Sequence, residues 1–180
     1  MFSLLSSLQN ASFLSSDEED FRFKMLHLLQ NEPRCFYRDC FPAHFTGSAL
    51  IIDPENRSIL LNHHRILNKW LQFGGHCDGN ENILEVAYRE ALEESGMTSL
   101  KVFSQTFIDL DIHEIPVNAK RQEPAHFHYD VRFVFAASQR DDLQVSDESH
   151  ELKWFSFEET RYLNLDRNLL RLINKAMSFK

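Results

Sequence analysis

Three residue types that mark particular protein classes are scarce in this sequence. Its 180 residues include three cysteines, five glycines and five prolines, and 43% of the residues are hydrophobic. Cys35, Cys40 and Cys77 cannot form a complete disulfide framework, so we expect free or structural thiols in a reducing environment. So little glycine and proline excludes the collagen-like and low-complexity classes. The sequence therefore predicts a globular protein.

Long hydrophobic runs and a surplus of positive charge are absent as well. The longest apolar run, Phe133 to Ala137, is far shorter than the roughly 20 residues of a membrane-spanning helix. No Lys or Arg precedes Arg22, whereas a secretory signal has a basic start. The net charge of −8 disfavours general nucleic-acid binding, although an acidic site that holds a metal ion could still bind a phosphorylated ligand. We therefore expect a cytoplasmic protein that binds neither membranes nor nucleic acids in general.

The spacing of hydrophobic residues divides the chain into two parts. Helical spacing from Phe2 to Leu8 and from Phe21 to Leu29 predicts two helices near the N-terminus. In the remainder, patterns typical of strands and of helices alternate. We expect strands at 49–52, 58–62, 70–73, 101–110, 126–137 and 151–157, helices at 83–95 and 161–179, and a loop at 116–124. Residues 1–40 are thus predicted to be a helical extension, and residues 41–180 one α/β domain with a mixed sheet covered by helices.

The predicted helix at 83–95 is unusually acidic. At 100° per residue, Glu90, Glu93 and Glu94 share one face, and apolar residues on another face can pack on a sheet. Most charge runs are solvated surfaces. Carboxylates three and four residues apart repel each other, however, and a divalent cation would convert them into a set of oxygen ligands. The helix by itself leaves both interpretations open.

This helix is part of a longer motif. From the second glycine of a pair, the sequence reads Gly75, five residues, Glu81, seven residues, Arg89-Glu90-Ala91, one residue, Glu93-Glu94, one residue and Gly96-Met97. The pattern resembles the Nudix box, G-x5-E-x7-R-E-U-x-E-E-x-G-U, in which U is an apolar residue, and every fixed position is filled. Ala91 stands where a larger aliphatic residue is usual, which affects packing more than chemistry. Phe73 stands where many members of the family have proline.

The resemblance implies a Nudix-type α/β/α sandwich with a mixed sheet, and hydrolysis of a nucleoside diphosphate linked to another group with Mg²⁺ or Mn²⁺. It also implies the roles of individual residues. Glu90, Glu93 and Glu94 would bind the metal with the carbonyl of Gly74, Arg89 would hold Glu90 in position, Glu81 would organise the loop, and Gly75 and Gly96 would be structural. Glu90 and Glu148 are alternatives for the general base that takes a proton from the attacking water.

Four further residues are candidates for contacts with a substrate, and each has a plainer interpretation. His76 follows the glycines and would contact phosphate or be structural. Lys69 precedes the box, where its charge would meet phosphate or only solvate a loop. His128 and Asp130 alternate with His126 on one strand and so share a face. That spacing resembles a set of metal ligands, although hydrogen bonding across a sheet or lining of a pocket is the commoner arrangement.

The leading hypothesis is a metal-dependent pyrophosphohydrolase that acts on a small phosphorylated substrate. The alternative is a non-catalytic Nudix domain that binds a nucleotide metabolite as a sensor or scaffold, which a loss of box carboxylates would favour. An isomerase of a small isoprenoid diphosphate would need additional Cys and Glu contexts that the sequence does not contain. Positions that mark particular substrates in some subfamilies are occupied by Asp111, Ile112 and His113, so no substrate is identified. The apolar stripe near the N-terminus leaves a homodimer open.

Overall fold

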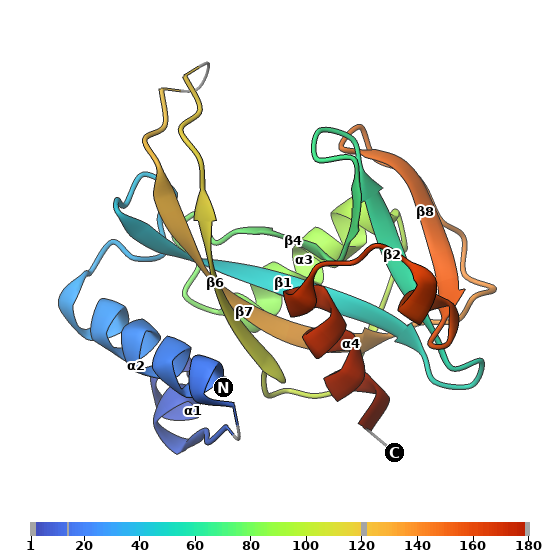
Figure 1. The fold of residues 1–180 in the computed structure, drawn as a ribbon, viewed down its shortest axis with the longest axis horizontal. Coiled ribbons are helices and arrows are strands. Elements are labelled where there is room, and N and C mark those ends of the chain that lie inside the picture. Colours follow the sequence, from blue (N-terminus) through green and yellow to red (C-terminus); the bar gives the residue numbers. More distant parts are fainter. Residues whose placement is uncertain (1–2, 14, 120–121, 179–180) are drawn as a thin grey trace.

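Strand β1 lies at the centre of a mixed sheet (Figure 1). The computed structural model describes residues 3–13, 15–119 and 122–178. Within these ranges the strands are β1 (Ala43–Asp53), β2 (Ser58–His64), β3 (Lys69–Leu71), β4 (Phe73–His76), β5 (Lys101–Val102), β6 (Asp109–Ile115), β7 (His126–Ala136) and β8 (Ser149–Ser156). β1 pairs in parallel with β7 and antiparallel with β2 and β4. β3 and β8 extend the sheet beside β2, and β5 and β6 pair with β7.

Helices cover both faces of this sheet. The helical elements are α1 (Leu4–Asn10), α2 (Ser16–Asn31), α3 (Ile83–Ser95), the short 3-10 helix η1 (Glu159–Tyr162) and α4 (Arg167–Ser178). Side chains alternate along β1, so Phe45, Ala49 and Ile51 share a hydrophobic cluster with α3, whereas Leu50 and Ile52 share one with α4. The predicted α/β/α sandwich with a mixed sheet and N-terminal helices is confirmed.

The N-terminal helices contribute to the same core as the rest of the chain. Leu8 and Met25 are fully buried in the hydrophobic cluster that contains Phe45 and the apolar side of α3. Glu18 of α2 is buried too and accepts a hydrogen bond from Lys175 of α4. The extension is therefore attached by apolar and ionic contacts, and its boundary at residues 40 and 41 stays a prediction. The predicted roles of Phe2 and of residue 179 lie outside the described residues.

None of the helices in the described ranges is both long and apolar enough to cross a membrane. The predicted loop at 116–124 does join two paired strands, since β6 and β7 form an antiparallel pair on either side of it. The three cysteines are free thiols, as expected, and all three are buried.

Several predicted elements are wrong in their extent. The strand predicted at 49–52 extends from Ala43 to Asp53, and the strand predicted at 70–73 is divided between β3 and β4.

Local hydrogen bonds set two further boundaries that differ from the prediction. The strand predicted at 101–110 is divided into β5 and β6 by a turn in which the Ser104 hydroxyl donates to the Thr106 carbonyl at 2.9 Å. The helix predicted at 161–179 begins at Arg167, because the Asp166 side chain accepts a hydrogen bond from the Leu169 N–H at 2.7 Å. In both places a local bond between side chain and backbone sets the boundary, and hydrophobic spacing does not register such bonds.

A layer of buried charged residues lies between the sheet and helix α4. Arg132 of β7 is 3% exposed and pairs with Asp130, Asp109 and Asp111 at 2.8, 3.2 and 2.8 Å. Arg171 of α4 pairs with Asp109 at 2.9 Å. Burial by itself would lower the pKa of Arg132, but the three carboxylates outweigh burial and raise it. Arg132 is therefore the shared cation of three buried anions.

Replacing Arg132 with methionine is expected to destabilise the protein by about 3–5 kcal/mol, because three buried carboxylates would lose their common cation. Urea unfolding followed by circular dichroism measures the change. Lys24→Met is the matched control, because Lys24 pairs with Asp20 on the surface at 2.6 Å, and such pairs contribute at most about 1 kcal/mol. Similar small changes in both variants would contradict the central role of Arg132.

Candidate functional site

Strand β4 and helix α3 bring the residues of the box together. β4 pairs with β1 so that Gly74 lies opposite Ser48 and Gly75 opposite Gly47. A β-carbon on Gly75 would lie 2.5 Å from the carboxyl carbon of Glu90. A side chain at this position would displace the Glu90 carboxylate, which occupies the space beside the strand.

Helix α3 has the bounds that the sequence predicts, Ile83 to Ser95. It ends at Gly96, which has a φ of 69° and donates its backbone N–H to the Leu92 carbonyl at 2.9 Å. Glycine adopts this left-handed conformation without the strain that a side chain would impose. The last turn of the helix, which carries Glu93 and Glu94, is thereby closed at a defined residue.

Arg89 connects two of the box glutamates to the backbone of β4. Its Nη2 lies 2.9 Å from Glu90 Oε1 and donates to the His76 carbonyl at 3.1 Å, and its Nη1 donates to Glu93 Oε2 at 3.2 Å. Burial raises the pKa of Glu90, and the guanidinium of Arg89 opposes the shift. Because Arg89 is tied to the strand, it restrains the side chain of Glu90.

Glu94 is a buried carboxyl group that forms no ion pair with a cation among the described residues. It is 8% exposed, and its side chain accepts hydrogen bonds from Asn62 Nδ2 at 3.2 Å and from the Gly74 N–H. Burial raises the pKa of Glu94 to about 8, and the acidic groups Glu90 and Glu148 add to this shift. The buried oxygen of the Asn62 amide has no hydrogen-bond partner among the described residues. The oxygen atoms of Glu94 and Asn62 could serve as metal ligands, and no positive charge in the described part of the chain compensates them. The residues present therefore fit a hard divalent cation.

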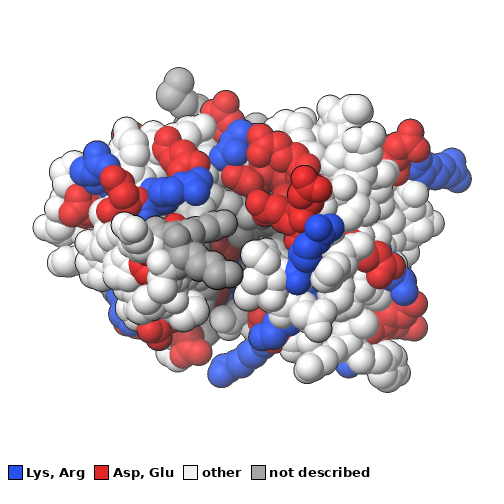
Figure 2. All heavy atoms as spheres, turned by 90° about the horizontal axis from the view of Figure 1, so that it is seen from above, with Lys and Arg blue, Asp and Glu red and all other residues white. Residues whose placement is uncertain are grey.

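The other predicted acidic residues, two in the box and Glu148 outside it, are more exposed. Glu93 has a side chain that is 59% exposed, and it pairs with Arg89. Glu81 is exposed, and so is Glu148, which lies close enough for its charge to raise the pKa of both Glu90 and Glu94. Acidic side chains gather densely in one area of the face seen in Figure 2, with Lys and Arg at its margins. Among the described residues, the carboxylates of the box do not meet at one position where they would together bind an ion. The predicted metal ligands therefore stay a prediction.

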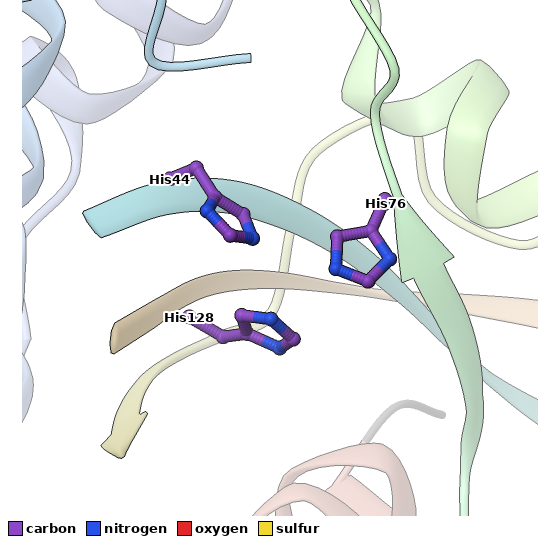
Figure 3. A group of neighbouring side chains, drawn as sticks. All are labelled: His44, His76 and His128. Carbon is purple, nitrogen blue, oxygen red and sulfur yellow. The ribbon is translucent and has the colours of Figure 1, made fainter. Parts of the chain in front are cut away.

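A second group of side chains does converge. His44, His76 and His128 place one ring nitrogen each within 4.8 Å of one another, and in Figure 3 the three rings turn toward a common space. Their ring centroids are 4.9 to 5.3 Å apart. Burial lowers the pKa of His44, lowers that of His76 to about 4, and moves that of His128 far below its usual value. All three imidazoles are therefore neutral at neutral pH.

Strand pairing, rather than sequence spacing, assembles this group. His44 of β1 lies opposite His128 of β7, which in turn lies opposite His113 of β6. Sequence analysis included His76 and His128 but missed His44 and gave no role to His113. No local signal identifies these two residues, because only the register of strands distant in the chain aligns them with His128.

Two further predicted substrate contacts, Asp130 and Lys69, have different surroundings from the histidines. Asp130 is 1% exposed and accepts hydrogen bonds from Ser48 at 2.8 Å, from Thr46 at 3.1 Å and from Arg132 at 2.8 Å. These contacts make it a member of the buried ionic layer. Lys69 is exposed at the start of β3. Neither residue contacts the box carboxylates in a bond or ion pair among the described residues.

The chain is similar to a number of solved structures. A NUDIX-family hydrolase from Clostridium perfringens is 26% identical over 74% of this chain and 95% of its own, with a TM-score of 0.51. An Ap4A hydrolase from C. elegans, solved as a binary complex, is 18% identical over 75% of this chain and 96% of its own, with a TM-score of 0.60. The Nudix hydrolase RenU from M. smegmatis is 18% identical over 74% and 83%, with a TM-score of 0.54. No curated protein sequence matches.

The sequence model of the NUDIX domain matches residues 43–174. This range covers well over half of the chain and includes the sheet, helix α3 and most of α4. It begins at the first residue of β1 and leaves α1 and α2 outside. Because the match takes in the complete box together with the strands that position it, the chain belongs to the NUDIX domain family.

Proposed function

We propose that the protein hydrolyses a diphosphate linkage in a small substrate of the nucleoside-diphosphate-X type, by attack of water on phosphorus with Mg²⁺ or Mn²⁺. The observation that carries the proposal is the state of Glu94. It is buried beside Gly74 of β4, the acidic groups Glu90 and Glu148 raise its pKa further, and it forms no ion pair with a cation among the described residues. A purely structural carboxylate is normally paired when it is buried, as Asp130 is here.

The residues that would hold the cation are Glu94, Glu90, Glu93 and the carbonyl of Gly74. Once bound, a divalent cation supplies charge neutralisation for the diphosphate and lowers the pKa of the attacking water. Asn62 and the Gly74 N–H fix the orientation of Glu94, and Arg89 fixes that of Glu90. Glu93 would have to exchange its contact with Arg89 for the cation, which its exposure permits.

Two residues stay alternatives for the general base. Glu148 is exposed, and Glu90 is held by Arg89 against Gly75. Glu148 therefore has the greater freedom to approach a water molecule, whereas Glu90 is the better positioned of the two. One of the similar structures is an Ap4A hydrolase, and the proposed substrate class includes compounds of that type.

Glu94→Gln is expected to lower kcat by about 100-fold or more, because it removes the buried charge that would balance the cation. The measurement is turnover of ADP-ribose, dinucleoside tetraphosphates and nucleoside triphosphates with Mg²⁺ or Mn²⁺. Glu85→Gln is the matched control, since Glu85 is an exposed glutamate of the same helix. A wild-type protein that binds one of these compounds but hydrolyses none would instead favour the sensor or scaffold alternative.

Arg89→Ala is expected to lower kcat by about 10- to 100-fold while KM changes little, because Glu90 would lose the residue that orients it. Steady-state kinetics on the best substrate of the panel separates the two constants. Arg34→Ala, at an exposed pair with Asp39, is the control and should leave both unchanged. An unaltered kcat in Arg89→Ala would show that Arg89 has no positioning role.

A further inference from the structure

We propose that His44, His76 and His128 form a binding site for a transition-metal ion, with Zn²⁺ as the best fit, separate from the carboxylates of the box. The proposal does not rest on the proposed hydrolase activity. It rests on the placement of the three histidines, on the hydrogen bonding of their rings and on the types of ligand atom present.

The fold directs the three side chains into one space. His44 and His128 are directly opposite each other in the parallel pair of β1 and β7. His76 lies opposite Thr46, which is two residues from His44 and therefore projects from the same face of β1. Three strands that are distant in the sequence thus contribute one histidine each, and Figure 3 shows the rings turned toward one another.

Two ring nitrogens in this space are unpaired. The Nε2 atoms of His44 and His128 are buried, and neither has a hydrogen-bond partner among the described residues. The other ring nitrogen of His44, Nδ1, lies 3.1 Å from the Cys40 carbonyl, which accepts hydrogen bonds only. Nδ1 must then carry the proton, so Nε2 presents a lone pair. A histidine that donates one N–H to a carbonyl and offers the other nitrogen is in the arrangement that metal-binding histidines use.

The spacing is close to that of a bound ion. Zn²⁺ binds histidine nitrogen at about 2.0–2.1 Å, which places two nitrogens of a tetrahedral site roughly 3.4 Å apart. The ligand atoms of the three histidines already lie within 4.8 Å of one another, so small rotations of the side chains bring them to that distance. Three protein ligands would leave a fourth position open for water or another oxygen or nitrogen donor.

The ligand type selects the class of ion. Three neutral imidazoles suit Zn²⁺ and other first-row transition metals, whereas Mg²⁺ prefers carboxylate, carbonyl and water oxygens. Further imidazoles surround the three: the His126 ring centroid lies 5.0 Å from that of His44, and the His113 centroid lies 5.5 Å from that of His128. His113 also contacts the Asp111 carboxylate at 3.0 Å, which is the type of outer contact that supports a histidine near a metal.

This site and the box lie on opposite sides of β4. A β-carbon on Gly75 would point to Glu90 of helix α3. The next residue, His76, projects the other way, because side chains alternate along a strand. The backbone of His76 still accepts a hydrogen bond from Arg89. The two groups are thus separate in their ligands but adjacent through one residue of the strand.

The test uses the full chain after removal of metal with a chelator, titrated with Zn²⁺ in competition with a chromophoric chelator. The wild type should bind one equivalent, and His44→Gln and His128→Gln should each weaken binding by at least about 10- to 100-fold. His63→Gln is the matched control, because His63 lies beside Trp70 and His150, away from this group. Glu94→Gln separates the two sites and should leave Zn²⁺ binding unchanged.

Cobalt substitution covers the case in which a histidine variant fails to fold. Co²⁺ added to the metal-free wild type should give the visible absorption of a four- or five-coordinate nitrogen site, and Zn²⁺ should displace it. The proposal is overturned if the wild type binds neither ion stoichiometrically. It is equally overturned if folded histidine variants bind Zn²⁺ as tightly as the wild type, or if Glu94→Gln alone abolishes binding.

Discussion

The parallel pairing of β1 with β7 is the constraint on which the rest of the structure depends. It extends from Ala43 opposite Phe127 to Ile52 opposite Ala136. A shift of one residue would exchange the side chains that face α3 with those that face α4, and both hydrophobic clusters would be lost. Parallel neighbours also require a long connection. Here that connection contains β4 and the acidic helix, so one pairing fixes both the core and the position of the box.

The same pairing places different chemistry on the two faces of the sheet. Beside α3, glycines of β4 leave room for Glu90 and the Gly74 N–H binds Glu94. On the opposite face, the histidines are followed along β7 by Arg132 and its three carboxylates. Burial acts on both sets, but with different results: Arg132 is paired with carboxylates within the protein, whereas Glu94 has no ion-pair partner among the described residues and burial raises its pKa. A buried titratable group whose pKa is strongly shifted marks a candidate functional site.

Much of the fold is predictable from sequence, because its strongest elements have strong periodic patterns. Helix α3 matches its prediction at both ends, since thirteen residues of helical spacing are followed by a glycine that suits the left-handed cap. Strand β7 matches to within a residue for the same reason. The errors at Ser104 and Asp166 arise where one side chain bonds to the nearby backbone, which alters the path of the chain without altering hydrophobicity.

The sequence by itself determined the acidic face of helix α3 and its approach to the glycines of the box, because these residues are close in the chain and the helical period relates them directly. Only the tertiary structure decided that His44 meets His76 and His128, that Asp130 is a buried partner of Arg132, and that Glu94 is buried with no ion-pair partner among the described residues. Those facts depend on the register between distant strands and on burial. Both arise from the packing of the whole chain, and no local pattern encodes them.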